Sequence, residues 1–285
     1  MDIILRPGRP ADANSCGLIC YHAFKAIAEA HGFPPDFPSP EAAIGLMNYI
    51  FSNSAAWSLV AEKNGQILGS NFLWEGDTIA GVGPITIDPQ VQNASVGRKL
   101  MESAIHRADE KGLAGVRLVQ AAYHNRSLSL YAKLGFDVRE PLSVIQGPAL
   151  GIQFAGYHVR PAEEGDLEKC NELCQKIHGH NRSNELLGTI WAGTASVVEY
   201  NGKISGYTSQ LGFLGHTVAE TNNALKAIIG AATGFAGPGF LLPSRNAEVL
   251  VWCLRNGLRI IQPMTLMTKG FYNEPAGFFL PSVLY

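Results

Sequence analysis

The sequence predicts an α/β protein made of two tandem domains. Its 285 residues exceed what one small α/β unit needs and suit two domains. Strand-like and helix-like patterns alternate along the first half, as they do in sheets flanked by helices. Residues of the first half also recur at the same spacing in the second, which indicates an internal repeat. We place the domains at residues 1–148 and 156–285, with a join near Pro148 to Gly156.

The first elements predicted are a short strand over residues 3–5 and a helix over 11–30, whose apolar residues form one stripe. His31-Gly32 ends this helix, and the proline-rich stretch 33–40 forms a stiff loop before a second helix over 41–51. Two strands, 57–61 and 66–74, flank an Asn-Gly turn typical of a hairpin.

A strand over residues 79–87 comes next and ends at Asp88-Pro89, because proline has no N–H to continue a ladder. A helix with one buried face begins at Val96 and continues to Ala108. A strand over 115–120, a short helix over 125–134 and a further strand from Phe136 complete the first domain.

Small and polar residues fill the loop before the helix that begins at Val96. Small residues at the start of a helix leave the N–H groups of its first turn uncovered, and these donors with the helix dipole make an anion site. Arg98 and Lys99 add two positive charges beside it. The residues therefore favour a phosphate-bearing ligand.

This segment resembles the acyl-CoA pyrophosphate loop of the GNAT acetyltransferase superfamily, whose pattern is Gln/Arg-x-x-Gly-x-Gly/Ala. Gln92, Ser95 and Gly97 fall on its three defined positions, with Ser95 in place of the usual first glycine. Residues 125–136 are similar to a second segment of the family, "Asn … Leu-Tyr-x-Lys-Leu-Gly-Phe", at the expected distance downstream. The two matches together identify the chain as a GNAT-like protein of the tandem type.

The resemblance implies two tandem GNAT-like domains, each a mixed, mostly antiparallel sheet flanked by helices. Arg6-Pro7 and Asp12 recur as Arg160-Pro161 and Asp166, and Asn64-Gly65 recurs as Asn201-Gly202. Near the end of the repeat, Asn246 and Trp252 are predicted in the places of Asn125 and Tyr131. The phosphate loop has no counterpart in residues 212–232, so residues 156–285 are predicted to be a degenerate GNAT-like domain and residues 1–148 the catalytic, acetyl-CoA-binding one.

By this resemblance acetyl-CoA is the co-substrate. Backbone N–H groups of residues 95–99 would bind its diphosphate, backbone groups of Ile85 and Ile87 would pair with the pantetheine arm, and Asn125 would hydrogen-bond that arm further along. Tyr131 falls on the tyrosine that gives a proton to the departing CoA thiolate, although an aromatic residue packing a helix onto a sheet is the alternative. The implied contacts are Ile85, Thr86, Ile87, Gln92, Asn93, Ala94, Ser95, Val96, Gly97, Arg98, Lys99, Asn125, Ser127 and Tyr131.

The region between the first two helices borders the acceptor pocket in GNAT folds. Phe33 and Phe37 are therefore candidate walls, as are Tyr49 and Phe51, with capping of the core as the alternative for each. An amine with a pKa near ~10 must lose a proton before it attacks, but the strand before the loop carries no carboxylate to accept it. The candidates for that base are Glu75, Asp77, His22 and His124, each of which could equally be an ordinary surface group.

The function implied is transfer of an acetyl group to a primary amine of a small molecule or peptide by direct attack. A catalytically silent acyl-CoA sensor and a scaffold remain alternatives, and neither the acceptor nor the preferred acyl length can be read. We expect one working site, in the first domain. The tail, residues 271–285, should pack on the second domain or across the join, and could bring Tyr285 near the first pocket.

The composition of the chain argues against several other classes of protein. With 46% hydrophobic and 16% charged residues the chain can bury sizeable cores, and a net charge of −2 argues against nucleic acid as a partner. No apolar run approaches the ~18 residues of a membrane span, and residues 1–6 show no signal-peptide pattern, so we expect a cytoplasmic monomer or homodimer with no membrane partner.

The cysteines and paired histidines suggest neither a disulfide framework nor a metal site. Four of the five cysteines form two pairs, each one helical turn apart: Cys16/Cys20 and Cys170/Cys174. This spacing suits small buried core residues rather than a zinc site. His178 and His180 lack an evident third ligand, so no metal is expected.

Overall fold

The computed structural model describes residues 3–91 and 95–284. The first half contains β1 (Ile4–Pro7), α1 (Ala13–Ala30), α2 (Pro40–Ser52), β2 (Ala56–Lys63), β3 (Gln66–Trp74), β4 (Ile79–Val82), β5 (Thr86–Ile87), α3 (Val96–Glu110), β6 (Gly115–Ala121), α4 (Asn125–Lys133) and β7 (Asp137–Gln146). The second half contains β8 (Tyr157–Pro161), α5 (Leu167–His178), α6 (Ser183–Trp191), β9 (Ser196–Tyr200), β10 (Lys203–Thr208), β11 (Thr217–Ala219), α7 (Asn222–Ala231), β12 (Phe240–Pro243), α8 (Ala247–Arg255), β13 (Arg259–Gly270) and β14 (Phe278–Leu280).

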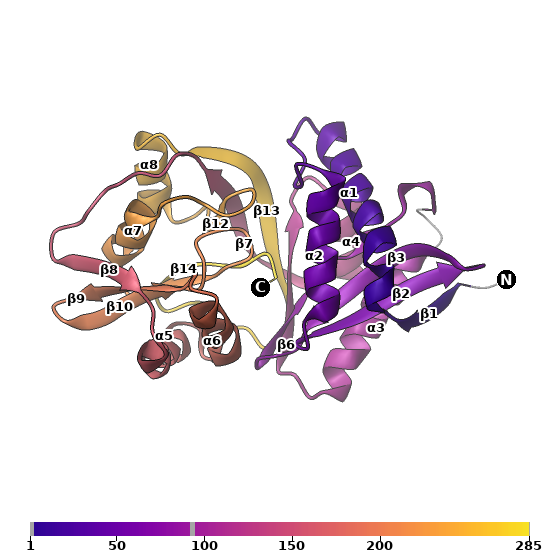
Figure 1. The fold of residues 1–285 in the computed structure, drawn as a ribbon, viewed down its shortest axis with the longest axis horizontal. Helices are drawn as coiled ribbons and strands as arrows, with labels where there is room; N and C mark the ends of the chain where they lie inside the picture. The colour runs from indigo at the N-terminus through magenta and orange to yellow at the C-terminus, as the bar shows by residue number, and fades with distance from the viewer. Residues whose placement is uncertain (1–2, 92–94, 285) are drawn as a thin grey trace.

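Two sheets organise the chain (Figure 1). The larger has the strand order β1-β2-β3-β4-β6-β13-β7-β12, with β5 paired to β3, and the smaller has the order β14-β11-β10-β9-β8. Only β4 and β6 run parallel among the strand pairs that the structure describes. The predicted fold class, mixed and mostly antiparallel sheets flanked by helices, is confirmed.

Helices cover both faces of the first half of the larger sheet. Along β2, Val60 packs with the α1 and α2 side chains, whereas Leu59 and Ala61 pack on the opposite face with Val96 and Leu100 of α3. This alternation follows from the two-residue period of a strand. The loop between α1 and α2 therefore lies on the face opposite α3.

The packing of α1 against α2 depends on a glycine, and this permits a stability test. A Cβ at Gly17 would lie 2.6 Å from Ile44 Cα, so the two backbones could not keep their approach. We expect Gly17→Ala to destabilise the fold by about 1–3 kcal/mol, the usual cost of overpacking. Gly45→Ala is the matched control in α2, because nothing lies within 4 Å of its Cβ, and it should stabilise by up to about 1 kcal/mol through helix propensity. Urea unfolding curves of both variants measure this, and destabilisations of equal size would contradict it.

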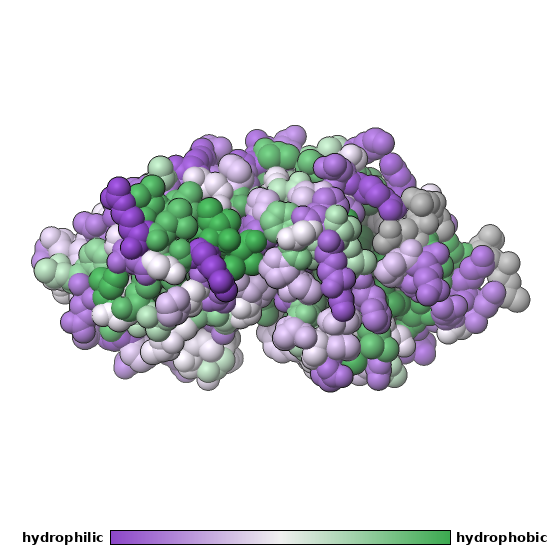
Figure 2. All heavy atoms as spheres, turned by 90° about the horizontal axis from the view of Figure 1, so that it is seen from above, coloured by the Kyte–Doolittle hydropathy of each residue, from purple (hydrophilic) through white to green (hydrophobic). Residues whose placement is uncertain are grey.

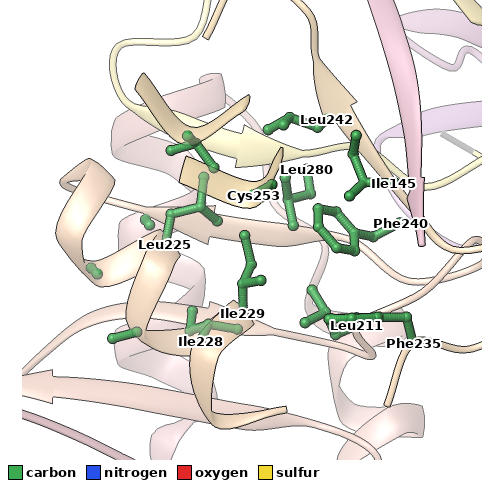
Figure 3. Packing of buried hydrophobic residues seen from close by; sticks show 14 of the residues in the cluster. Ile145, Leu211, Leu225, Ile228, Ile229, Phe235, Phe240, Leu242, Cys253 and Leu280 are labelled. Carbon is green, nitrogen blue, oxygen red and sulfur yellow. The ribbon is translucent and has the colours of Figure 1, made fainter. Parts of the chain in front are cut away.

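The two halves exchange strands. β13 of the second half lies between β6 and β7, while β7 also pairs with β12. The cores follow the strands: Ile145 of β7 is buried in the core of the second half (Figure 3), and Met267 of β13 is buried in the core of the first. Seen from above, the halves are two lobes joined side by side, with a notch along one edge (Figure 2). Each half therefore completes the other.

The internal repeat extends to individual ion pairs. Arg6 donates to Asp12 at 2.7 Å and to Glu62 at 2.8 Å, and Arg160 makes the same pair of contacts with Asp166 and Glu199. The two Asn-Gly hairpin turns also share a left-handed asparagine, with φ of 52° at Asn64 and 51° at Asn201. Each guanidinium contact lowers the pKa of its aspartate through the hydrogen bond. These repeated contacts belong to the fold rather than to one site.

The predicted alignment of the repeats near their ends is wrong by one residue. Phe136 N–H donates to the Tyr131 carbonyl just after α4, and Leu258 N–H donates to the Cys253 carbonyl just after α8. Cys253, and not Trp252, therefore stands in the place of Tyr131, and His124 rather than Asn125 matches Asn246 as the N-cap. Helical periodicity alone could not fix this register, because α8 is apolar on neighbouring positions.

The tail packs on the second half, as predicted. β14 pairs with β11 through the register Thr217 to Leu280 and Val218 to Phe279. Beyond it, Val283 N–H donates to the Phe213 carbonyl at 2.8 Å, which brings the chain back to the boundary between the halves. Tyr285 lies outside the described residues. Within the described ranges, none of the helices combines the length and apolar character needed to cross a membrane.

Candidate active site

A cavity of about 940 Å³ lies between the two halves. The first half contributes α1, α2, the ends of β4 and β6, and the first turns of α3 and α4. The second half contributes Gln210, Phe213, Leu214, residues 236–238, Met264, Val283 and Leu284. The cavity is large enough for a ligand of coenzyme size to enter in part, together with a second small molecule.

The cavity opens where β4 and β6 separate. The two strands pair in parallel only from Ile79–Gly115 to Gly81–Arg117, and β4 ends at Val82. The predicted single strand over residues 79–87 is therefore wrong: Pro84 has no N–H for the ladder, and the chain resumes as β5, which pairs with β3. Residues 82–87 line one side of the gap and residues 118–121 the other. Backbone groups facing such a gap are free to pair with an extended ligand.

The N-terminus of α3 faces this gap, and among the described residues no side chain caps it. Its N-cap is Ser95, whose φ of 60° lies in the left-handed region and whose side chain makes no capping hydrogen bond. Ser95, Val96, Gly97 and Arg98 all line the cavity. The corresponding helix of the second half, α7, is capped by Thr221, whose hydroxyl accepts from Ala224 N–H at 3.1 Å. Of the two N-cap residues, Ser95 leaves the first-turn N–H groups of its helix to other partners, whereas Thr221 takes up one of them.

A second helix N-terminus, that of α4, faces the same cavity. His124 caps it, with Nδ1 accepting from Ser127 N–H at 3.3 Å. Burial, together with the charge of Arg126, lowers the pKa of His124, so the ring is neutral near pH 7. Arg126 and Ser127 also line the cavity. Arg126 and Arg98 therefore place two cations on the side where the helices begin.

Tyr131 lies on α4, nearly fully buried, and lines the cavity. Burial raises its pKa to about 12, although a hydrogen bond with the Ser127 side chain opposes the shift. Its ring also packs edge-on against Phe136, with ring centroids 6.3 Å apart. Near neutral pH the phenol therefore keeps its proton in a fixed position.

Buried polar side chains in the gap lack protein partners. Thr86 Oγ1 and both polar atoms of the Gln120 side chain are buried and make no hydrogen bond to the described residues. Thr86 and Gln120 line opposite sides of the gap. Since buried polar groups are rarely left unpaired, this arrangement fits a polar ligand between β5 and β6.

One carboxylate, that of Asp36, also lines the cavity. Asp36, in the loop between α1 and α2, accepts from Gln262 Nε2 at 2.7 Å, and Tyr123 donates to Gln262 Oε1 at 2.9 Å. Burial raises the pKa of Asp36 above its ordinary value, and the Gln262 bond partly offsets this. Phe33 stacks on Tyr123, with ring centroids 4.4 Å apart. Gln262 belongs to β13, so the second half positions a side chain of the first.

Residues 24–136 match the family model "Acetyltransferase (GNAT) family". The chain contains a GNAT acetyltransferase domain. This confirms the resemblance of the two sequence segments, and it supports the assignment to the N-acetyltransferases. A comparison with curated proteins returned no match.

Solved structures share the fold over nearly the whole chain. A Pyrococcus horikoshii protein with a provisional acetyltransferase assignment has a TM-score of 0.69 at 15% identity, covering 97% of this chain and 94% of that one. A GCN5-related N-acetyltransferase from Sphaerobacter thermophilus has a TM-score of 0.63 at 15% identity, with coverages of 95% and 96%. A tandem GNAT protein from the clavulanic acid biosynthesis pathway has a TM-score of 0.57 at 14% identity, with coverages of 94% and 98%. These identities establish likeness of fold.

Most of the residues predicted to contact acetyl-CoA or the acceptor line this same cavity. The lining includes Ile85, Thr86, Ile87, Ser95, Val96, Gly97, Arg98, Ser127, Tyr131 and Phe37. Lys99, Asn125 and Phe33 are not part of it, although Phe33 touches it through Tyr123. Gln92, Asn93 and Ala94 lie outside the described residues. The assignment of these residues to acetyl-CoA and acceptor stays a prediction.

The four candidate bases have different surroundings. Glu75 is paired with Arg107 at 2.7 Å, and Asp77 accepts from Asn184 and Glu185 N–H at the start of α6. His22 does not line the cavity, whereas His124 does. Of the four, His124 alone lines the cavity.

Sequence reasoning missed Asp36, Gln120, Arg126 and the wall contributed by the second half. Asp36 had a weak signal, because it stands between Phe33 and Phe37 in the stiff loop predicted to border the acceptor. Gln120 is one polar residue in an apolar strand, which is also the pattern of an exposed position. Gln262 had no signal, since its contact with Asp36 depends on strand exchange.

Proposed function

We propose that this protein transfers the acetyl group of acetyl-CoA to a primary amine by direct attack. One observation carries the proposal: the gap between β4 and β6 opens onto the N-terminus of α3, which no described side chain caps, within the cavity that Tyr131 lines. An anchored thioester arm and a proton donor are both required for acyl transfer to an amine. The gap and the helix end offer a place for the thioester arm, and the Tyr131 phenol offers the proton donor.

The residues present suit a coenzyme in the gap. N–H groups of the first turn of α3 would hold the diphosphate, with the Arg98 and Arg126 charges beside it. The backbone of Ile85 and Ile87 would pair with the pantetheine arm. Thr86 Oγ1 and Gln120 lie where the amides of that arm would pass, and the arm would satisfy these buried groups.

Acetyl-CoA supplies an activated acyl carbon as a thioester. The amine nitrogen forms a bond to this carbon as the bond from carbon to sulfur breaks. Tyr131 gives its proton to the leaving sulfur and regains one from the new, positively charged amide nitrogen, so the phenol is unchanged after each turnover. The pKa of about 12 ensures that Tyr131 starts protonated.

Release of free thiol in the presence of a panel of amines tests the activity. We expect acetyl-CoA to bind and thiol release to depend on an amine, with the acetylated amine seen by mass spectrometry. Acetyl-CoA binding without turnover on any amine would favour the silent sensor, and no binding would favour the scaffold.

We expect one acetyl-CoA per chain. In the second half, β11 pairs with β10 in the register in which β5 pairs with β3, and β14 pairs with the other edge of β11, so it fills the gap that stays open in the first half. The Thr221 cap also uses one of the N–H donors that a second diphosphate would need. Calorimetry should return a stoichiometry of one. A stoichiometry of two, with the second equivalent lost in Asn222→Ala, would contradict this expectation.

A further inference from the structure

The charged side chains that line the cavity come from different elements of the fold. Arg98 and Arg126 lie at the helix ends, and Asp36 is the one carboxylate among the described residues that line the cavity. It stands in the loop between α1 and α2, on the face of the sheet opposite α3. Cations therefore gather where a diphosphate would bind, and a single anion marks another part of the cavity.

Asp36 is held in place, but one of its oxygens remains available. Gln262 Nε2 donates to Oδ1 at 2.7 Å, and Tyr123 fixes the Gln262 amide from its other side at 2.9 Å. Gln262 is 1% exposed, so water does not compete for this contact. No donor among the described residues meets Oδ2, which leaves it free for a cation.

Apolar side chains form much of the wall of the cavity that this carboxylate lines. The cavity walls near the α1–α2 loop and from the second half include Phe24, Phe37, Leu46, Phe213, Leu214 and Val283. A carboxylate among such groups favours a ligand that carries one positive group on an apolar body, because other polar groups would lose their hydration without gaining partners.

The equivalent position in the second half has the opposite design. In the repeat, Arg245 of the second half stands in the place of Tyr123, because each comes one residue before the N-cap of its helix, α8 or α4. By the same alignment, Glu140 of the first half stands in the place of Gln262. Arg245 Nε donates to Glu140 Oε2 at 2.7 Å and Nη2 donates to Glu274 at 2.8 Å. An ion pair closes that position, whereas the neutral Tyr123–Gln262 pair leaves the Asp36 charge uncompensated.

We propose that Asp36 binds the ammonium group of the acceptor and takes its first proton, and that the acceptor is an amine with a largely apolar body. This inference rests on the proposed acetyl transfer. The protonated amine gives one proton to Oδ2 of Asp36, which passes it to solvent, and the neutral amine then forms the amide. Gln262 acts as a positioning residue, because it touches Asp36 and not the amine.

Asp36→Asn tests the inference with an isosteric amide that can still accept from Gln262. With an aryl-alkyl amine as probe, we expect kcat/KM for the amine to fall at least 10²-fold while the dissociation constant of acetyl-CoA stays within twofold. An acceptor panel matched in size should favour the amine with an apolar body over amines that carry a carboxylate or several hydroxyls. Unchanged kcat/KM in Asp36→Asn, or a preference for the polar amines, would overturn the inference.

Two further variants separate the roles. His124→Asn removes the rival base but keeps a helix cap, because asparagine caps α8 at the equivalent place, and its loss in kcat/KM should be smaller than the loss in Asp36→Asn. A larger loss in His124→Asn than in Asp36→Asn would assign the base to His124 and overturn the proton step. Gln262→Leu should raise KM for the amine about tenfold, with little change in kcat or in the affinity for acetyl-CoA. If KM for the amine, kcat and the affinity for acetyl-CoA were all impaired to the same extent, Gln262 would have a merely structural role. If the wild-type protein acetylates no amine, the proposed function fails, which is a result distinct from each of these.

Discussion

Replacing Tyr131 with phenylalanine is expected to lower kcat about 10²-fold or more, the usual contribution of a positioned acid. Tyr131 lines the cavity, and the substitution keeps its ring packed against Phe136 while it removes only the hydroxyl. Burial raises the pKa of this hydroxyl to about 12, so the wild-type phenol stays protonated throughout the neutral range, as the proposed donor must. The dissociation constant of acetyl-CoA should change little. Steady-state thiol release and calorimetry measure the two quantities.

Tyr49→Phe is the matched control, because it removes a hydroxyl from an exposed tyrosine outside the cavity. Its kcat should equal that of the wild-type protein. Turnover of Tyr131→Phe at the wild-type rate would remove the proton-donor role and leave Tyr131 as an aromatic that packs α4 onto the sheet.

The elements of the fold were largely readable from the sequence, but their partners were not. Periodicity and turn residues locate α1, α3 and the β2–β3 hairpin, since these patterns depend on neighbours in the chain. β7 and β13 have equivalent places in the repeat, so either could pair with β6 of the first half or with β12 of the second. Ile145 of β7 is buried in the core of the second half and Met267 of β13 in the core of the first, which shows that the strands are exchanged. No local sequence pattern distinguishes this pairing from one in which each half keeps its own strand.

In the candidate site, too, the features that depend on neighbouring residues were predictable and those that depend on the other half were not. The open end of α3 was predictable, because small residues before an amphipathic helix have a local consequence. The acceptor end was not, because Asp36 becomes distinctive only when Gln262 reaches it from the other half. The wall from Phe213 to Leu284 likewise exists only in the assembled chain.

The two halves keep the same frame and differ at the places that a ligand would need. Both retain the arginine that joins an aspartate and a glutamate at the first strand. In the second half Thr221 caps α7, β14 fills the gap beside β11, and Cys253 replaces the tyrosine. Each change removes a different requirement for acyl transfer, which favours a structural role for this half together with its contribution to the acceptor wall.

Gly97→Glu is expected to weaken acetyl-CoA binding by more than tenfold, that is, by over about 1.4 kcal/mol. Gly97 lies in the first turn of α3 and lines the cavity. The new carboxylate would stand at the positive end of the helix dipole, where it would gain only about 0.3–1 kcal/mol for the free protein. It would also occupy the place of the diphosphate and repel it, which is why the loss should exceed that figure.

Gly97→Ala is the matched control, because it separates the effect of the added negative charge from the effect of the added volume. A Cβ at Gly97 would meet Ile87 Cγ1 and Leu130 Cδ2 at 3.7 Å, which is ordinary contact, so the methyl group should be accepted and binding should stay near wild type. Calorimetry of both variants, with thermal unfolding as a check on the fold, provides the comparison. Equal affinities in Gly97→Glu and Gly97→Ala would mean that the diphosphate does not bind at the start of α3, whereas a loss confined to the glutamate variant would place it there.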